Sequence, residues 1–400
     1  MAGLLPIAAA RPLADSPLVV SYGAGVDSTA MLVGLHRRGI RPDLIVFSDT
    51  GAEKPETYAA LDAADRWLEA VGFPTVTRTR YNVVEARYTT LEGNCLQNDG
   101  LPSLAYGHHS CSLKWKIQSI DDHVWGVRGW QPALDALHAG RQVVRAIGYD
   151  DGKADRRRFG KVEKLEKAEA AKGEWSPWHN WYPLQAWGWK RADCLEAIRS
   201  ETQLGDYLEA VGLAGRAPVK SACFFCPATK PHELLELARD HPELALRAVV
   251  MEFRAETGKH GLKTLNGLGL GREEGARKGS RNFSWRRLLL AEGLLAADWR
   301  ERAEALDLLP PRIIWDAYAA SCARLRDRIE AAKLAGDVEL SARLKIEKRD
   351  TLGPDWAATD RPVKCKEAAR ERRAAQKAWR DAVKAAKLIN AAKLSRSIAA

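Results

Sequence analysis

The stretch VVSYGAGVDSTAML, residues 19–32, joins a short apolar segment to a helical pattern through a glycine-rich turn. The residues up to Val20 are typical of a buried strand, and from Ser28 onward apolar residues recur at helical spacing. Gly23 and Gly25 allow a tight turn and a close approach of the backbone. Free N–H groups and the helix dipole then favour an anion, with a phosphate group as the natural candidate. An ordinary turn between a strand and a helix is the alternative interpretation.

Strand-like and helix-like segments alternate in the first half of the chain. We expect strands at residues 18–21, 44–47, 75–77 and 143–147, and helices at 28–38 and 56–71. This alternation predicts an α/β protein with a doubly wound parallel sheet of the Rossmann-like type. Ligands of such sheets bind at the carboxyl ends of the strands, where the glycine turn and the segment after Phe47 should lie together. Helical patterns dominate from about residue 232.

The composition predicts two or three domains with a sizeable core, since 46% of the 400 residues are hydrophobic. No apolar run approaches the ~20 residues of a membrane span. The first residues lack the basic segment that is typical of a signal peptide. The seven cysteines are an odd number in a long chain, which argues against a disulfide framework. We therefore expect a cytoplasmic protein with no membrane partner.

The positive charge is concentrated in residues 361–400. This segment contains 12 Lys and Arg residues against 3 Asp and Glu, so it carries +9 of the formal net charge of +10. Its alanine-rich composition, with Trp379 and Leu388, predicts an exposed basic helix that can lie along a polyanion such as DNA or RNA. A solvated terminal helix without a partner is the alternative interpretation.

A second stretch, FSDTGAEKPETYAAL over residues 47–61, carries polar groups at the end of the next strand. Asp49, Thr50 and Gly51 follow the apolar residues directly, and Pro55 marks the start of a helix. We expect Asp49 and Thr50 to hydrogen-bond a nucleotide that is held at the first turn.

Together the two stretches resemble the PP-loop ATP pyrophosphatase superfamily, in particular the branch of the phosphoadenylylsulfate (PAPS) reductases and the DNA phosphorothioation protein DndC. The family loop Ser-Gly-Gly-x-Asp-Ser corresponds to residues 23–28, with Gly23 for the leading Ser and Ala24 for the first Gly. Ser21 is a candidate to supply the missing hydroxyl. The resemblance covers roughly residues 15–230 and includes AIGYDDGKADRRR and YPLQAWGWKRADCLEAI further along the chain. It implies an adenine nucleotide alpha hydrolase-like fold.

The resemblance and the composition together predict four regions. These are a loose leader (1–16), a PP-loop nucleotide-binding domain with a cysteine site (17–231), a helical region (232–360) and a basic helical tail (361–400).

The resemblance also implies a site for ATP and Mg²⁺. The family loop cradles the β- and γ-phosphates, and cleavage between the α- and β-phosphates adenylates a substrate. Hard cations prefer oxygen ligands, so we expect Asp27 to organise Mg²⁺. The expected nucleotide-binding residues are Ser21, Gly23, Ala24, Gly25, Val26, Asp27, Ser28, Thr29, Asp49, Thr50, Gly51 and Gly148. Asp27, Ser28 and Arg156 are the candidate catalytic residues, with Arg156 or Arg157 clamping a phosphate or lying on a solvated face.

Three cysteines in two segments are candidate ligands of a metal or cluster, and one of the segments resembles the cluster-bearing reductases. Cys223 and Cys226 form a C-x-x-C motif before a proline. The segment HHSCSLKWKIQ places Cys111 at the first cysteine of the family's Cys-Cys-x-x-x-Lys motif, with Ser112 at the second. Lys114 and Lys116 in this segment either face a substrate anion or lie on a wet helix face.

An iron–sulfur cluster usually takes four thiolates. We expect a 4Fe-4S cluster on Cys111, Cys223 and Cys226, with Cys95 as the nearest fourth ligand and Cys194 in reserve. Three ligands with one open iron are a further interpretation, because an open iron can carry a sulfide for transfer. The alternatives are zinc, with His108 or His109 as a ligand, a redox disulfide, and simple buried cysteines.

These expectations combine into ATP-dependent adenylation coupled to sulfur transfer, in the style of nucleic-acid thiolation, with a sulfur donor protein as a partner. A sulfonucleotide reductase is the first alternative, although the end LSRSIAA lacks the Glu-Cys-Gly nucleophile of those enzymes. The second alternative is a nucleotide-sensing, nucleic-acid-binding protein without turnover, for which the altered loop is the sign.

Overall fold

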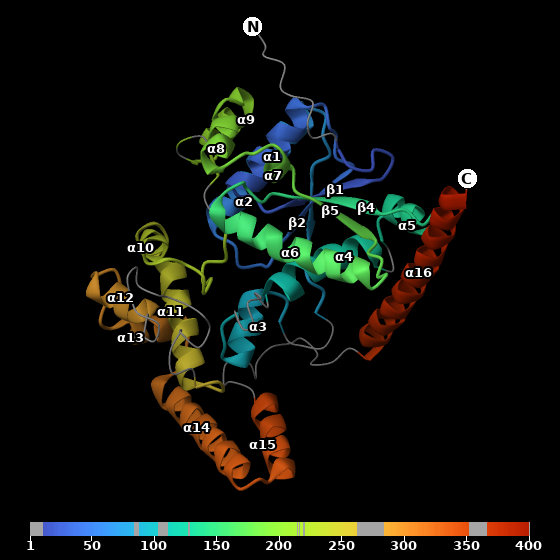
Figure 1. The fold of residues 1–400 in the computed structure, drawn as a ribbon. Helices are drawn as coiled ribbons and strands as arrows, with labels where there is room; N and C mark the ends of the chain where they lie inside the picture. Colours follow the sequence, from blue (N-terminus) through green and yellow to red (C-terminus); the bar gives the residue numbers. More distant parts are fainter. Residues whose placement is uncertain are drawn as a thin grey trace.

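A five-stranded sheet forms the centre of the structure, a computed structural model (Figure 1). The model describes residues 11–83, 88–102, 111–126, 129–213, 215, 217–218, 221–261, 284–351 and 366–399. The strands are β1 (Leu18–Tyr22), β2 (Leu44–Ser48), β3 (Val76–Thr79), β4 (Val143–Ile147) and β5 (Trp178–Trp181). They lie in the order β3-β2-β1-β4-β5, and every neighbouring pair is parallel. The predicted α/β class with a parallel, Rossmann-like sheet is confirmed.

Helices cover both faces of this sheet. One face packs against α1 (Val26–Arg37), α2 (Pro55–Ala70), α8 (Arg191–Arg199) and α9 (Thr202–Ala210). The other packs against α4 (Gln118–Trp125) and α5 (Gln131–His138). Alternate residues of β1 point to opposite sides, so Val20 joins the first core and Val19 the second. Burial on both faces explains why the strand is apolar without alternation.

The tryptophan-rich segment before α8 contributes a strand that the sequence did not predict. Trp178 and Trp181 are the ends of β5, and they pack in the cores on opposite faces of the sheet. The short helix α7 (Pro183–Ala186) follows β5. The charged segment ahead of β5 forms the helix α6 (Lys153–Ala171).

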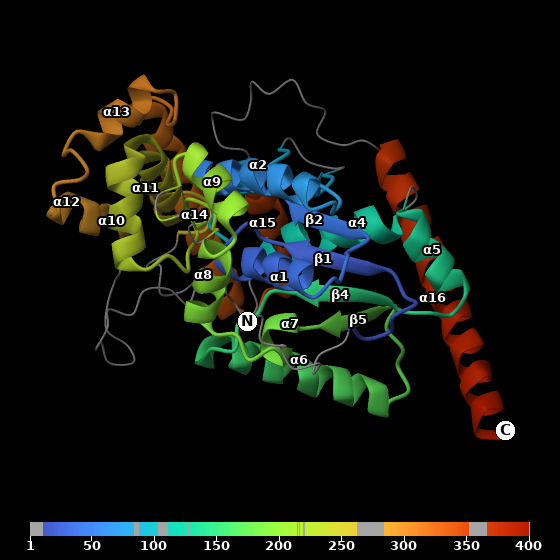
Figure 2. The same cartoon turned by 90° about the horizontal axis from the view of Figure 1, so that it is seen from above.

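The second half of the chain is helical, as predicted. It comprises α10 (Pro231–Asp240), α11 (Pro242–Thr257), α12 (Trp285–Ala291), α13 (Trp299–Ala305), α14 (Arg312–Leu334) and α15 (Val338–Asp350). Most of these helices share a separate apolar core with α3 (Leu91–Asn98) and the π-helical segment η2 (Ser112–Ile117). Both views show α10–α13 at one side of the sheet and α16 (Lys366–Ala399) at the opposite side (Figures 1 and 2). Within the described residues, no helix has the length and apolar character needed to cross a membrane.

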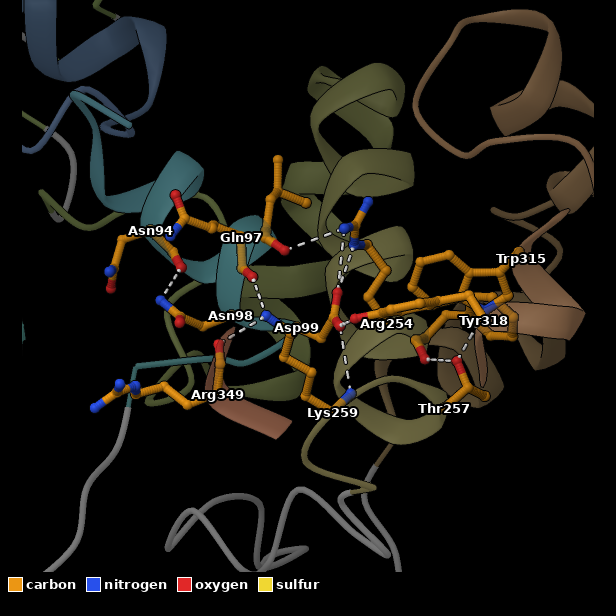
Figure 3. A network of polar contacts seen from close by, with 12 residues as sticks. Asn94, Gln97, Asn98, Asp99, Arg254, Thr257, Lys259, Trp315, Tyr318 and Arg349 are labelled. Atoms are coloured by element: carbon orange, nitrogen blue, oxygen red, sulfur yellow. Dashed lines mark hydrogen bonds and ion pairs between the residues drawn. The ribbon is translucent and has the colours of Figure 1, made fainter. Parts of the chain in front are cut away.

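A buried ion pair ties α3 to this helical half. The Arg254 guanidinium of α11 lies 3.1 Å from the Asp99 carboxylate at the end of α3, and both side chains are at most 1% exposed. Arg254 also donates to the carbonyl oxygen of Leu96, and the Tyr318 hydroxyl of α14 donates to Asp99 (Figure 3). The backbone N–H of Lys259 completes the network at 3.3 Å. Three helices are thereby fixed around one carboxylate.

The basic helix α16 packs against the sheet domain through one apolar face. The Trp379 ring lies 4.9 Å from the Trp125 ring of α4, and Ala386 is 1% exposed. Ala382 and Val383 join the same apolar cluster, and this spacing of three and four residues makes one helical stripe. Ile389 lies against Gly140, just before β4, so α16 lies near the amino end of that strand. The sequence predicted an exposed basic helix at the end of the chain. In the described residues, α16 buries this one apolar stripe and exposes its remaining faces.

Removal of the Arg254 side chain should destabilise the protein strongly. Arg254→Ala leaves the Asp99 charge buried without its cation, and losing one partner of a buried pair costs about 3–5 kcal/mol. Arg312→Ala is the matched control, because Arg312 pairs with Glu301 where both side chains are more than half exposed. Exposed pairs contribute about 0–1 kcal/mol. Denaturant unfolding checks this, and equal losses in the two variants would contradict the buried pair.

Candidate nucleotide and cysteine sites

The turn between β1 and α1 is closed by hydrogen bonds to Ser28. Ala24 adopts φ +54°, in the left-handed region that normally favours glycine. The Gly23 N–H donates to the Ser28 hydroxyl at 3.2 Å, and that hydroxyl donates to the Gly25 carbonyl oxygen at 3.1 Å. The alanine at this family glycine position is thus accommodated with the turn intact. The loop lies at the start of α1, where Asp27 occupies the first helical turn.

The end of β4 lies directly against this loop. A Cβ atom at Gly148 would lie 2.9 Å from the Ser28 Cα and 3.0 Å from its backbone nitrogen. Only glycine permits this approach. The sequence predicted that Gly148 and the loop belong to one site, and the structure brings them together.

Asp27 is surrounded by charged groups that the sequence did not identify as site residues. The Arg191 guanidinium at the start of α8 donates to its carboxylate at 2.7 Å. Burial raises the pKa of Asp27, Arg191 opposes this rise, and Asp150 and Asp155 add to it. Three carboxylates thus approach one another near the loop, where a hard cation would relieve their repulsion. Asp150 and Asp155 lie in the segment that follows β4, and Arg191 lies in the segment that follows β5. Position after a strand is therefore the signal by which the sequence could have identified them.

A basic pocket of about 500 Å³ borders this group. Its lining comprises Asp151, Gly152, Lys153, Arg156, Arg157 and Lys190. Arg156 holds the Asp151 carboxylate through two nitrogens, at 2.6 and 2.5 Å. Lys153, Arg157 and Lys190 also line the pocket, so its positive charges outnumber its one carboxylate. Lys190 directly precedes Arg191, which pairs with Asp27. The candidate phosphate clamp therefore lies in a cationic pocket next to the loop.

The two polar residues that follow β2, Asp49 and Thr50, make different kinds of contact. Asp49 accepts from the Gly51 N–H at 2.7 Å and the Tyr58 hydroxyl at 2.8 Å, and it pairs with Arg80. Burial opposes the ionised form of Asp49, but these bonds leave its pKa lowered. Thr50 is fully buried, and its hydroxyl lies 3.3 Å from the Cys223 sulfur. Thr50 thus contacts the cysteine site here, and its nucleotide contact stays a prediction.

The three motif cysteines lie within electrostatic range of Lys116. Burial alone would lower the pKa of Lys116, but the nearby Glu53 carboxylate and the cysteine sulfurs raise it. The Cys226 N–H donates to the Cys223 carbonyl oxygen at 3.0 Å, which makes the motif a tight turn. Burial raises the pKa of Cys111, and the neighbouring Cys226 raises it further. Burial likewise raises the pKa of Cys223. Lys116 therefore faces the cysteine site rather than a purely wet surface.

The remaining cysteines differ in their distance from this site. Cys95 of α3 is buried, and its pKa is raised by burial and then by Cys111. Cys194 packs instead in the core on the α1 side of the sheet, so the reserve ligand lies elsewhere. Cys322 is fully buried on α14, in agreement with a structural role. Cys365, His108 and His109 lie outside the described residues.

The donor chemistry of the cysteine site fits a thiolate-bound metal. In the described part of the chain, no three Cys, His, Asp or Glu side chains already surround a common point as metal ligands do. The Glu53 side chain is 1% exposed, and its Oε2 has no hydrogen-bond partner there. A metal would satisfy this oxygen and would bind thiols that have lost their protons.

The two sites adjoin one another. The Ser221 hydroxyl, two residues before Cys223, lies 3.0 Å from the Cβ position of Gly25. Glu53, four residues after Asp49, pairs with Cys223 through a single antiparallel bridge. The segment that carries the cysteine motif therefore contacts both the loop and the end of β2.

Comparison of the chain with protein-family models, curated proteins and solved structures finds no match. The described residues form an α/β protein with a parallel sheet, a glycine-containing turn after β1 and an adjoining segment that carries Cys223. The functional conclusion rests on this geometry and on the sequence motifs.

Gly148→Ala should damage the loop and the stability of the fold together. The added Cβ meets backbone atoms of Ser28, which cannot yield as a flexible side chain would. Overpacking of this kind costs about 1–3 kcal/mol. Gly160→Ala is the matched control, since a Cβ there meets nothing within 4 Å in the helix α6. We expect that control to unfold at the same denaturant concentration or slightly higher. A Gly148 variant as stable as the control would disprove the close approach.

Proposed function

We propose that the protein is a PP-loop enzyme of the PAPS reductase-like branch, with an adenine nucleotide alpha hydrolase-like fold. It would convert ATP to AMP and pyrophosphate, adenylating a substrate for sulfur transfer. The observation that carries this proposal is the contact of one segment with both sites. Ser221 lies against the glycine loop, and Cys223 lies against the end of β2. A nucleotide at the loop and a sulfur-bearing group at the cysteines would then be neighbours.

The residues around the loop suit a bound Mg²⁺·ATP. The backbone at Gly23–Gly25 and the Ser28 hydroxyl lie where phosphate oxygens would be held at the start of α1. Asp27 has Asp150 and Asp155 as neighbours, and this oxygen set suits Mg²⁺. Arg156 and Lys190 supply positive charge at the side of the loop. Bound ATP supplies an electrophilic phosphorus and a pyrophosphate leaving group, and these residues position and neutralise it.

The cysteine site suits an iron–sulfur cluster of the 4Fe-4S type, with zinc as the alternative. Supporting this, Cys111, Cys223 and Cys226 all act electrostatically on Lys116. Such a cluster supplies electrons or a transferable sulfur when bound. Burial raises the pKa values of Cys111 and Cys223 and so disfavours their free thiolates. A bound metal would replace the protons of these thiols.

A nucleic acid is the proposed acceptor, and α16 is the proposed contact surface. The basic residues whose side chains are described on this helix are all exposed, and they comprise Arg370, Arg373, Lys377, Arg380, Lys384 and Lys387. The apolar stripe around Trp379 fixes the helix to the sheet domain. Because α16 lies near the amino end of β4, it would hold the nucleic acid away from the reaction site. Its contribution is sequence-independent affinity.

Asp27→Ala should weaken Mg²⁺·ATP binding roughly 10- to 100-fold, because it removes a carboxylate that would hold the cation. Asp62→Ala is the control, since Asp62 is 59% exposed on α2 and pairs with Arg78. Titration calorimetry measures the affinity, and pyrophosphate release measures turnover. Unchanged affinity would remove the loop from the site. Tight binding by the natural chain with no pyrophosphate under any acceptor would favour the sensing alternative.

Neutralisation of the basic face of α16 should flatten the salt dependence of nucleic-acid binding. Arg373→Gln, Lys377→Gln and Lys384→Gln together leave the Trp379 stripe in place. Each lost phosphate contact reduces the slope of log K against log salt by about 0.9 on duplex DNA. The control replaces the exposed Lys161, Lys164 and Lys172 near α6 in the same way. Fluorescence anisotropy across salt concentrations measures both. Identical slopes would exclude α16 as the contact surface.

A further inference from the structure

A pocket of about 410 Å³ lies between α4 and α16, apart from the nucleotide and cysteine sites. Its volume is in the range of pockets that hold a small ligand. Trp125 and Trp379, whose ring centres lie 4.9 Å apart, both line it. The polar part of the lining combines both charges with amides, and it comprises Gln118, Asp121, Asp122, Gln376 and Arg380. The pocket therefore suits a flat ligand that carries both hydrogen-bond donors and acceptors.

The two tryptophans offer such a ligand different contacts. Trp125 is 6% exposed, and its indole N–H has no hydrogen-bond partner within the described residues. A buried donor without a partner is costly. A ligand that brings a carbonyl oxygen or a ring nitrogen to Trp125 would supply the acceptor. Trp379 is half-buried, so part of its ring is open to stacking.

A second pocket, of about 380 Å³, lies further along the same helix. Its lining also combines a tryptophan, an arginine and amides, namely Trp175, Arg141, Gln142 and Asn390. Gln376 of the first pocket and Asn390 of the second are about four turns, or about 21 Å, apart on α16. A whole number of turns places both on one side of the helix. The two pockets therefore lie at opposite ends of the apolar stripe around Trp379.

The charges decide which part of a polyanion would enter the first pocket. Arg380 lines this pocket, and Lys377 and Lys384 are exposed nearby on α16. The carboxylates of Asp121 and Asp122 disfavour a phosphate inside it. Phosphates would thus remain on the basic surface of the helix, while an uncharged aromatic base enters the pocket. The bases of a duplex are paired and stacked, so only an unpaired base is free to enter.

We propose that α16 binds single-stranded nucleic acid and that the two pockets beside it receive unpaired bases. This inference rests on the proposed function in that it takes a nucleic acid as the partner. A base in the first pocket stacks on the Trp379 ring and exchanges hydrogen bonds with the amides and carboxylates there. Because α16 lies near the amino end of β4, these bases hold the strand and are not the ones that react.

A comparison of two ligands tests the base contacts on the natural chain. The ligands are a labelled single strand of thymidines and a strand of the same length whose sugars carry no bases. We expect the base-bearing strand to bind about tenfold tighter or more, because stacking on aromatic side chains contributes to affinity at each base. Both strands should give the same salt dependence, since that dependence is set by the phosphates. Fluorescence anisotropy measures both quantities. Equal affinities would overturn the base pockets and leave α16 standing as a phosphate-contact surface.

A pair of variants of the full chain tests the first pocket directly. Ala375→Leu fills the pocket, and Ala374→Leu is the matched control, because Ala374 is exposed and is not part of the lining. Leucine and alanine both favour helices, so α16 should persist in each variant, which circular dichroism checks. We expect Ala375→Leu to bind the base-bearing strand about fivefold more weakly or less tightly still, with an unchanged salt dependence, and Ala374→Leu to bind as the natural chain does.

The outcomes separate this inference from the proposed function. Equal binding by the two variants would exclude the first pocket as a base site and would not affect the role of α16 in phosphate contacts. A natural chain that binds neither strand would overturn the inference together with the nucleic-acid part of the proposed function.

Discussion

The short pairing between Glu53 and Cys223 connects the parts of the molecule on which a function depends. It joins the residues after β2 to the segment that leads from the sheet domain into α10. On one side of this pairing, Ser221 lies against the glycine loop, and on the other the cysteine turn faces Lys116. Without it the loop and the thiols would be separate features. With it they form one surface at the carboxyl edge of a parallel sheet, where such folds place their ligands.

The electrostatics of this edge change sign over a short distance. Asp150 and Asp155, which follow β4, lie near enough to Asp27 to raise its pKa, and Arg191 forms an ion pair with Asp27. Alongside lies the cationic pocket with Arg156 and Lys190. A ligand that combines a divalent cation with a polyphosphate matches this alternation, because each half neutralises one patch.

Local sequence patterns predicted the first two strand–helix units almost to the residue, because buried strands and amphipathic helices have distinct periods. They missed β5, since the tetrapeptide WHNW has no strand periodicity and its tryptophans fill cores on both faces. Motif spacing also found the loop and the cysteines. It did not find Arg191 or Glu53, because their roles depend on partners 164 and 170 residues away. Such contacts exist only after the tertiary fold has formed.

The buried carboxylate at the end of α3 has a consequence for the order of folding. Its hydroxyl partner on α14 lies 219 residues later in the chain. Contacts of such long range form late, and during synthesis they must wait until the distant segment has been made. Until then an unpaired charge at Asp99 opposes closure of the core that encloses Cys95 and borders the other thiols. The core that contains Cys95 is therefore completed only after α14 has been synthesised.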